Sequence, residues 1–349
     1  MAAAASIEKP FVTVIVPCRN EAAFLGACLD SILENDYPRD RMEVLVADGM
    51  SEDGTAELIA RYAARDARVR RIENPSRVTP AGLNRAIEAA RGEIVIRVDA
   101  HSEIAPRYAG LCVDYLQNTD AENVGGAMRT VAVGTGPFAE AIRLALTHWF
   151  GVGNSRFRTG ASAARWVDTV FGGCWRRETL LRVGKFNERL ARGQDMEFNI
   201  RLRKAGGKIL LVPEIESRYF ARAGLADFIR HNWTNGVWAV LPFAYSGAAP
   251  VRWRHLAPLT FVAALAASAA AAVFWPPLRW LPAFAAAPYI ALNAAVSLSA
   301  AMKEKDPKLA MLLPWTFAAL HLPYGLGSAW GAIRLARIGL RRALKEESA

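Results

Sequence analysis

The hydrophobic pattern changes near residue 256. Before it, short apolar runs alternate with amphipathic stretches, and after it long apolar runs dominate. Four short runs near the N-terminus are rich in β-branched residues, which predicts strands buried on both faces. Strands that alternate with helices at this spacing join by right-handed crossovers into a mainly parallel α/β sheet. The predicted strands are Phe11–Pro17, Met42–Asp48, Val69–Glu73 and Glu93–Asp99, and the predicted helices are Glu21–Leu33, Thr55–Ala64 and Pro80–Ala90.

The following region is less regular. Its pattern predicts helices at Phe138–Thr147 and Asp195–Ala205, a strand at Val167–Phe171, and a polar Arg- and Gly-rich loop at Gly151–Ala164. The segment Leu225–Val240 mixes apolar and aromatic residues with polar ones. It fits either a helix in the membrane interface or a helix packed in a core.

Three apolar segments follow, each of about twenty residues or more, which is enough to cross a hydrocarbon core of about 30 Å. They are Leu256–Trp275, Leu278–Ala301 and Leu309–Ile333. With a cytoplasmic N-terminus, three crossings place the basic segment Arg334–Lys345 outside, against the positive-inside tendency. Either this tail is an exception, or one segment, such as the Pro- and Gly-interrupted Leu309–Ile333, re-enters or lies flat.

The predicted organisation has five parts: a tail at 1–10, an α/β domain at 11–222, an amphipathic helical linker at 223–255, a transmembrane region at 256–333, and a basic tail at 334–349. The start of the chain lacks a basic stretch followed by an apolar run, so no secretory signal is expected. The four cysteines show no paired CxxC spacing, which argues against disulfides and structural zinc and fits a reducing compartment. We therefore expect a multi-pass protein of the inner membrane with its α/β domain in the cytoplasm.

The formal net charge is +10 and the pI is near 9.7. The arginines form no stripe interleaved with aromatics, so a nucleic-acid partner is not expected. They suit an acidic membrane surface and anionic ligands such as a pyrophosphate.

Polar side chains follow the predicted strands, where ligands bind in parallel α/β sheets. Asn20 and Glu21 follow the first strand and Asp48 ends the second, positions from which amide and carboxylate groups can bind a base or a ribose. For Ser51 and Asp53 the alternative is simple capping of the next helix. Asp99 and His101 end the fourth strand, and a carboxylate with an imidazole suits Mn²⁺, or less well Mg²⁺, with diphosphate oxygens completing the shell.

As an ordered series these motifs resemble the GT-A glycosyltransferases of family 2, over about Phe11 to Phe220. The series is Pro17-x-x-Asn20-Glu21, Asp48-Gly49-x-Ser51-x-Asp53-Gly54-Thr55, Pro80-Ala81-Gly82-Leu83-Asn84, Asp99-x-His101 and Gln194-Asp195-x-Glu197 with Arg201-x-Arg203. The resemblance implies a Rossmann-like GT-A domain with a uridine pocket, a metal site and a catalytic base. It assigns Pro17, Asn20, Glu21 and Asp48 to the pocket, Asp53 to the nucleoside, Gly82 and Asn84 to the ribose and donor, Asp99 and His101 to the metal, and Asp195 to the base.

The implied reaction inverts the anomeric centre, because one base opposite the leaving group gives direct displacement. For Asp195 the alternative is a carboxylate favoured by a helix N-terminus. Trp175, after Gly172-Gly173, fits either a sugar platform or the core, and Arg156, Arg158 and Arg165 fit either a pyrophosphate site or a solvated loop.

The chain lacks the Q-x-x-R-W motif of the processive synthases in this family, and most resembles the ExoA-type enzymes of exopolysaccharide (succinoglycan) assembly. Those enzymes add one sugar, glucose in the succinoglycan case, to an undecaprenyl-diphosphate-linked glycan. We therefore expect a UDP-sugar donor, Mn²⁺ or Mg²⁺ as cofactor, and a lipid-linked saccharide acceptor. The alternatives are a polyprenyl-phosphate sugar transferase and a non-catalytic nucleotide-sugar-binding membrane protein.

Overall fold

The computed structural model describes residues 9–134, 136–222, 224–246 and 253–346. The chain divides into two compact units. The first comprises Met1–Arg129 and Gly160–Tyr219, and the second comprises Thr130–Thr159 and Phe220–Ala349.

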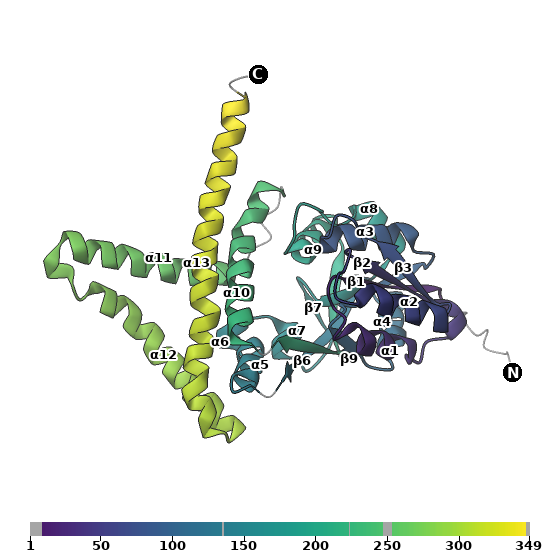
Figure 1. Cartoon of the computed structure of the whole chain (residues 1–349), viewed down its shortest axis with the longest axis horizontal. Coiled ribbons are helices and arrows are strands. Elements are labelled where there is room, and N and C mark those ends of the chain that lie inside the picture. Colours follow the sequence, from purple (N-terminus) through teal and green to yellow (C-terminus); the bar gives the residue numbers. More distant parts are fainter. Residues whose placement is uncertain (1–8, 135, 223, 247–252, 347–349) are drawn as a thin grey trace. The chain divides into compact units, whose positions relative to one another are not determined.

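The first unit is built on a twisted mixed sheet with the strand order β3-β2-β1-β4-β8-β6-β9-β5, in which β7 pairs with β9 (Figure 1). Its parallel half confirms the predicted alternation of strands and helices. The strands are β1 (Val12–Cys18), β2 (Met42–Asp48), β3 (Val69–Glu73) and β4 (Ile94–Arg97), and the helices between them are α1 (Leu25–Leu33), α2 (Thr55–Arg65) and α3 (Thr79–Ala89), with a short 3-10 turn at Arg39–Arg41.

Beyond β4 the sheet is antiparallel in the pairs β4–β8, β6–β8, β5–β9 and β7–β9. The elements are β5 (Ser102–Ile104), α4 (Tyr108–Asn118), β6 (Ala121–Val133), β7 (Arg165–Val167), β8 (Phe171–Arg176), α8 (Arg177–Val183), α9 (Gln194–Lys204) and β9 (Lys208–Arg222). The α/β expectation is therefore confirmed, but the expected mainly parallel sheet is wrong, because the sheet is parallel in only one half.

The predicted strand Val167–Phe171 is wrong. Most of that segment is the connection between β7 and β8, and β8 begins where the prediction ended. Gly172 and Gly173, in the following strand, have φ values of 66° and 115°. Glycine is depleted in strands, so a strand with a Gly-Gly pair as its second and third residues escapes a search for β-branched residues.

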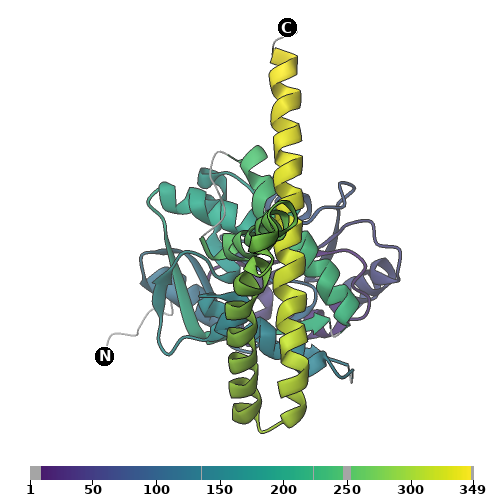
Figure 2. The same cartoon turned by 90° about the vertical axis from the view of Figure 1, so that its left-hand side faces the viewer.

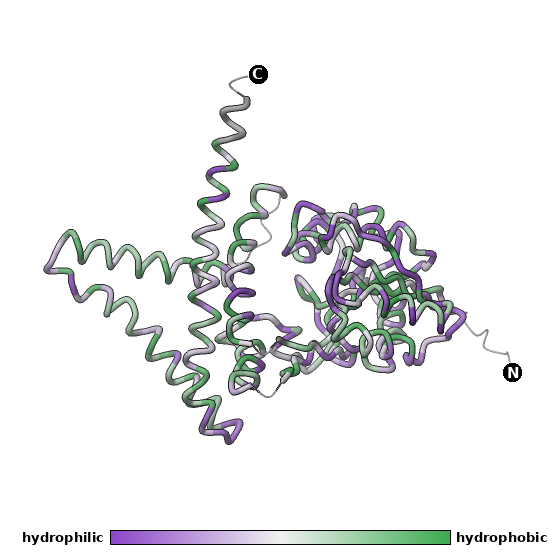
Figure 3. The backbone as a smooth tube through the Cα atoms, in the orientation of Figure 1, coloured by the Kyte–Doolittle hydropathy of each residue, from purple (hydrophilic) through white to green (hydrophobic). Residues whose placement is uncertain are grey.

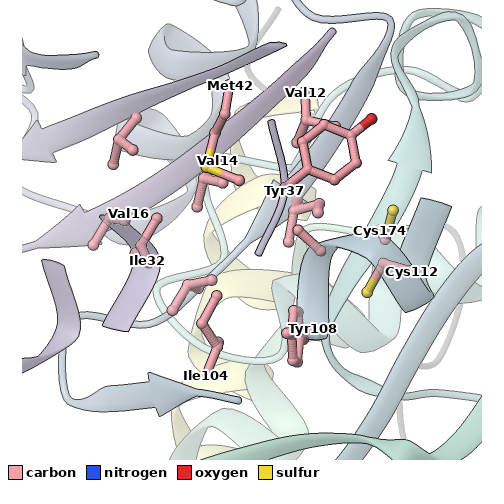
Figure 4. Close-up of a cluster of buried hydrophobic side chains, with 14 of the residues drawn as sticks. Val12, Val14, Val16, Ile32, Tyr37, Met42, Ile104, Tyr108, Cys112 and Cys174 are labelled. Atoms are coloured by element: carbon pink, nitrogen blue, oxygen red, sulfur yellow. The ribbon is translucent and has the colours of Figure 1, made fainter. Parts of the chain in front are cut away.

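The core of the first unit lies between the sheet and its covering helices. Figure 4 shows side chains of β1 and β2, among them Val12, Val14 and Met42, beside Tyr108 and Cys112 of α4. The β-branched residues of β1 and β2 are almost completely buried, as expected for strands covered on both faces. All four cysteines are buried and free.

The second unit is mainly helical in the part of it that the structure describes, and it also includes the ends of β6 and β9. It contains α5 (Ala139–Thr147), α6 (Trp149–Val152), α7 (Arg156–Thr159), α10 (Leu225–Val240), α11 (Trp253–Phe274), α12 (Leu281–Glu304) and α13 (Pro307–Glu346), with 3-10 turns at Leu241–Ala244 and Pro276–Leu278. The predicted loop Gly151–Ala164 thus contains the end of α6 and all of α7.

Among the described residues, α11, α12 and α13 are long and apolar enough to cross a membrane (Figure 3). Their large apolar side chains lie largely on the surface: Phe274 is 88% exposed, Phe284 74% and Trp315 71%. A surface of this kind is matched to lipid rather than to water. α13 also continues to Glu346, so the predicted basic tail is helical up to that residue.

Helix α10 packs along α13 (Figures 1 and 2). Its Phe228, Asn232 and Val237 are buried, which favours the packed-helix interpretation of this segment. Small residues let the two backbones approach closely: a Cβ at Gly236 would lie 2.0 Å from the carbonyl oxygen of Tyr324, and one at Gly327 would lie 2.2 Å from that of Trp233. Close approach at glycines is typical of helix pairs in membranes.

Candidate active site

Two loops at the carboxyl ends of β1 and β2 are tied together by hydrogen bonds. The backbone N–H of Asn20 donates to Ser51 Oγ at 2.9 Å, and Asn20 Oδ1 accepts from the N–H of Glu52 at 2.9 Å. Asn20 has a φ of 55°, a left-handed conformation that asparagine tolerates better than most residues. The sequence thus placed these residues correctly at one edge of the sheet.

Asp53 joins the same loops. Its Oδ2 accepts from the N–H of Ala22 at 3.1 Å, and its Oδ1 accepts from the N–H and hydroxyl of Thr55 at 3.1 and 2.5 Å. Thr55 is the first residue of α2, but the N-cap of that helix is Gly54 and no side chain caps it, so the helix-capping alternative for Asp53 is wrong. These bonds hold the pKa of Asp53 below its usual value, although burial acts in the opposite direction.

Asp48, at the end of β2, is fully buried and both of its oxygens are occupied. Oδ1 accepts from the N–H of Ser51 at 3.0 Å, and Oδ2 pairs with Arg71 Nη2 at 2.5 Å. Pro17 lies one residue before the end of β1, opposite Ala47 of β2. Both therefore border the two joined loops, and their contact with a base stays a prediction.

The structure gives Gly82 and Asn84 packing roles in α3. A Cβ at Gly82 would lie 2.9 Å from Asn74 Nδ2. The buried amide of Asn84 donates to the carbonyl oxygen of Phe186 at 2.9 Å and to Glu188 Oε1 at 2.8 Å, and it accepts from the N–H of Phe186 at 2.9 Å. Asn84 thus anchors the segment that leads to α9, and donor contact by either residue stays a prediction.

One buried arginine joins two of the predicted site residues. Arg97, the last residue of β4, donates from Nε to Asp99 Oδ1 at 2.9 Å, and its Nη2 lies 2.9 Å from the same oxygen. Its Nη1 donates to Asp195 Oδ1, on the first turn of α9. The structure therefore brings the predicted metal ligand and the predicted base to the same guanidinium.

The two carboxyl groups differ in acidity. Burial raises the pKa of Asp99, but the charges of Arg97 and His101 outweigh it, so the pKa lies below the usual value. Burial and the charge of Asp99 raise the pKa of Asp195, and Arg97 offsets this only in part. One carboxylate is thus held ionised, and the other is made a stronger proton acceptor.

His101 turns toward the first loop. Its Nδ1 lies 3.2 Å from Glu21 Oε1, and its ring makes an edge contact with Tyr219 at 5.1 Å between centroids. No three His, Cys, Asp or Glu side chains converge on a metal position within the described residues. The donor set of Asp99 and His101 fits a site in which a substrate diphosphate and water supply the other ligands of Mn²⁺.

Trp175 is a core residue. It is 2% exposed, and its ring packs edge-on against Phe186 and Phe198 at 6.2 and 5.9 Å. Of the arginines that the sequence left open, Arg165 opens β7 in the first unit, whereas Arg156 and Arg158 lie on α7 in the second.

Sequence reasoning missed the contribution of Arg97. The signal was available: a single charged residue interrupts the buried run Ile94–Val98. A buried arginine needs a buried anionic partner, and this position predicts one.

The mixed sheet, with its acidic strand-end motif and its carboxylate on α9, defines a glycosyltransferase of the GT-A type. The chain belongs to glycosyltransferase family 2: the family model described as "Glycosyl transferase family 2" matches residues 13–184.

Individual relatives agree. The chain is 31% identical to the succinoglycan biosynthesis protein ExoA of Rhizobium meliloti over 70% of this chain and 80% of that protein. It is 25% identical to a dolichyl N-acetylglucosaminyl phosphate diacetamidodideoxyglucuronosyltransferase of Methanococcus voltae, over 65% of this chain and 72% of that protein. Among solved structures, it is similar to the mannosyltransferase PcManGT of Pyrobaculum calidifontis in complex with GDP-Man and Mn²⁺. The TM-score is 0.60 with 26% identity, and 93% of this chain and 88% of that chain are covered.

Proposed function

We propose that the chain is an inverting, metal-dependent glycosyltransferase that transfers a hexose, such as glucose, from a UDP-sugar to a polyprenyl-diphosphate-linked glycan. The product belongs to bacterial exopolysaccharide or cell-surface polysaccharide synthesis. The observation that carries the proposal is the joining of Asp99 and Asp195 by Arg97 at the carboxyl end of β4. This arrangement sets a cation-binding carboxylate beside a more basic one.

In this reaction Asp195 accepts the proton of the acceptor hydroxyl as that oxygen attacks the anomeric carbon. Its raised pKa makes it a better base at neutral pH than an unperturbed aspartate. Asp99 and His101 would hold Mn²⁺ or Mg²⁺, and such a cation stabilises the negative charge that develops on the departing diphosphate. Direct displacement with one base inverts the anomeric configuration.

The donor assignment rests on the joined loops after β1 and β2. We propose that Pro17, Asn20, Glu21 and Asp48 line the uridine pocket, with Asp53 supporting it and with Gly82 and Asn84 near the ribose. The solved relative PcManGT was captured with GDP-Man, so a guanosine donor is the alternative that the assay must separate.

The acceptor assignment rests on the relatives and on the apolar helices. ExoA is named for succinoglycan biosynthesis, and the Methanococcus voltae enzyme is named for a dolichyl-phosphate-linked substrate. A chain with three helices long enough to cross a membrane is suited to an undecaprenyl-linked acceptor that stays in the bilayer. We place the protein in the inner membrane as a multi-pass protein, with the first unit in the cytoplasm.

The test is nucleotide release by detergent-purified protein with Mn²⁺, across UDP- and GDP-sugars. Each donor is assayed alone, with a lipid-diphosphate-linked saccharide, and with a polyprenyl monophosphate. Release that needs the saccharide acceptor, and that Asp195→Asn abolishes, supports the proposal. Release driven by the monophosphate would instead identify a polyprenyl-phosphate sugar transferase. Nucleotide binding without release under any condition would identify a non-catalytic nucleotide-sugar-binding protein.

A further inference from the structure

Packing alone does not explain why a charged side chain occupies the buried position of Arg97. It is 5% exposed and ends a strand whose other residues are apolar and buried. Placing a guanidinium there costs desolvation free energy that its anionic partners must offset. A hydrophobic side chain would fill the same strand position without that cost, so the charge points to a role in the site.

The hydrogen bonds of Arg97 use one oxygen of each partner. Nε and Nη2 both face Asp99 Oδ1, and Nη1 faces Asp195 Oδ1. Within the described part of the chain, no hydrogen bond is made by Oδ2 of either carboxylate. Asp99 and Asp195 are 18% and 41% exposed. Each carboxylate is therefore oriented through one oxygen and keeps the other for chemistry.

We propose that Arg97 is a positioning residue that sets the metal-binding carboxylate and the catalytic base in register with each other. This inference rests on the proposed function, because it takes Asp99 as the metal ligand and Asp195 as the base. The fork of the guanidinium is essential to the role, since its separate N–H groups reach two carboxylates at once. An ammonium carries the same charge but lacks this planar fork.

The role has a consequence that a purely structural ion pair lacks. A positive charge beside Asp99 opposes the binding of a divalent cation there. Its removal should tighten Mn²⁺ binding while it slows turnover, because the base loses its alignment. A structural arginine whose loss loosens the fold would weaken binding and turnover together.

The experiment compares the full-length wild type with Arg97→Gln and Arg97→Lys in detergent. Arg68→Gln serves as the matched control. Arg68 is also a mostly buried arginine in the first unit, and it binds Asp66 away from the site. Three quantities are measured: Mn²⁺ affinity by electron paramagnetic resonance, alone and with UDP; kcat and donor KM from nucleotide release; and the thermal midpoint.

For Arg97→Gln we expect Mn²⁺ to bind tighter by on the order of tenfold, the effect of removing one unit charge near a divalent ion. Its kcat should fall by roughly a hundredfold, the scale of a misplaced catalytic group. Arg97→Lys should keep wild-type Mn²⁺ affinity within about threefold and still lose most of kcat, since it retains charge without the fork. Arg68→Gln should lower only the thermal midpoint.

Unchanged or weaker Mn²⁺ binding in Arg97→Gln overturns the inference, as does a lysine variant with wild-type kcat. A wild type that binds Mn²⁺ but transfers no sugar refutes the proposed function instead. The comparison of Mn²⁺ affinity between the wild type and the Arg97 variants then still tests the effect of the Arg97 charge. A wild type that binds no Mn²⁺ with or without UDP overturns both the metal assignment and this inference.

Discussion

Arg201 uses every N–H group of its guanidinium in hydrogen bonds within the first unit. Nε and Nη2 donate to the two oxygens of Glu197 at 2.8 and 3.0 Å. Nη1 donates to the carbonyl oxygens of Val183 and Gly184 at 2.7 and 2.8 Å, and Nη2 also donates to that of Lys185 at 2.8 Å. One side chain thus fastens α9, which carries Asp195, to the end of α8.

Replacing Arg201 by alanine removes all five bonds, two of which bind the buried carboxylate of Glu197. The Glu197 side chain is only 4% exposed, and that of Arg201 is 27% exposed. Breaking a buried ion pair by removing one partner costs about 3–5 kcal/mol. For a unit of this size each kcal/mol lowers the midpoint by about 2–4 °C, which predicts a fall of about 10 °C.

The assay is thermal unfolding of detergent-purified protein, followed by circular dichroism. Arg203→Ala is the control, because Arg203 lies two residues along the same helix and is exposed. Its substitution should change the free energy of unfolding by about 0.5 kcal/mol or less. A difference of about 2 °C between the thermal midpoints of Arg201→Ala and Arg203→Ala corresponds to less than about one kcal/mol. If the two midpoints differ by no more than that, the hydrogen bonds of Arg201 contribute little to stability and the reasoning is refuted.

Two further predictions concern packing and pH. Gly327→Leu should lower the free energy of unfolding by at least about 1–3 kcal/mol, because its Cβ would meet the Trp233 carbonyl oxygen. The control is Gly339→Ala on the same helix, where a Cβ has nothing within 4 Å, so this variant should be neutral or slightly stabilising. Thermal midpoints of the two variants test this prediction. The hydrogen bonds from Arg68 lower the pKa of Asp66 to about 2. Asp66→Asn should therefore cost about 2 kcal/mol at pH 7. The deficit should shrink as the pH falls from about 4 toward 2, because wild-type Asp66 is protonated there; a deficit that stays constant between pH 7 and 3 would contradict it.

The parallel half of the sheet was predictable from sequence because β1, β2 and β4 are short, largely apolar and buried. The expected burial on both faces is wrong for β3, the edge strand, most of which is exposed. The places of Asn20, Asp48 and Asp99 at one edge of the sheet were predictable for the same reason: each lies at or just after the end of a strand that is easily located. The position of Asp195 relative to Asp99 was not predictable, since the arginine that joins them lies 98 residues earlier in the chain than Asp195. Periodicity reports only the local environment of a residue and not its distant partners.

Asn84 shows that a motif also does not reveal the distant partners of a residue. Its place in a recognisable motif suggested contact with the donor, and the structure shows that its amide binds Phe186, 102 residues away. A buried amide with all these bonds satisfied stabilises the fold whether or not a ligand is present. Motif position thus located the residue near the site without indicating that it holds the segment leading to the base.

The structure narrows the course of the last apolar helix. α13 is continuous from Pro307 to Glu346, despite Pro314 and Pro323 within it. A re-entrant segment turns back inside the bilayer, which a continuous helix cannot do. The helix either crosses the membrane or lies along its surface.

The distribution of basic residues favours a position of α13 along the membrane surface. Lys305 lies in the turn between α12 and α13, and Lys303 and Lys308 lie in the helix ends beside it. The C-terminal end of α13 is also basic, whereas the connection before α12 carries only Arg279. From the positive-inside tendency we expect α11 and α12 to cross the membrane as a hairpin and both ends of α13 to lie in the cytoplasm. Because the four native cysteines are buried, a thiol reagent should label Gly339→Cys selectively. We expect labelling of inverted vesicles and none of intact cells treated with an impermeant reagent; labelling only from outside would show that α13 crosses.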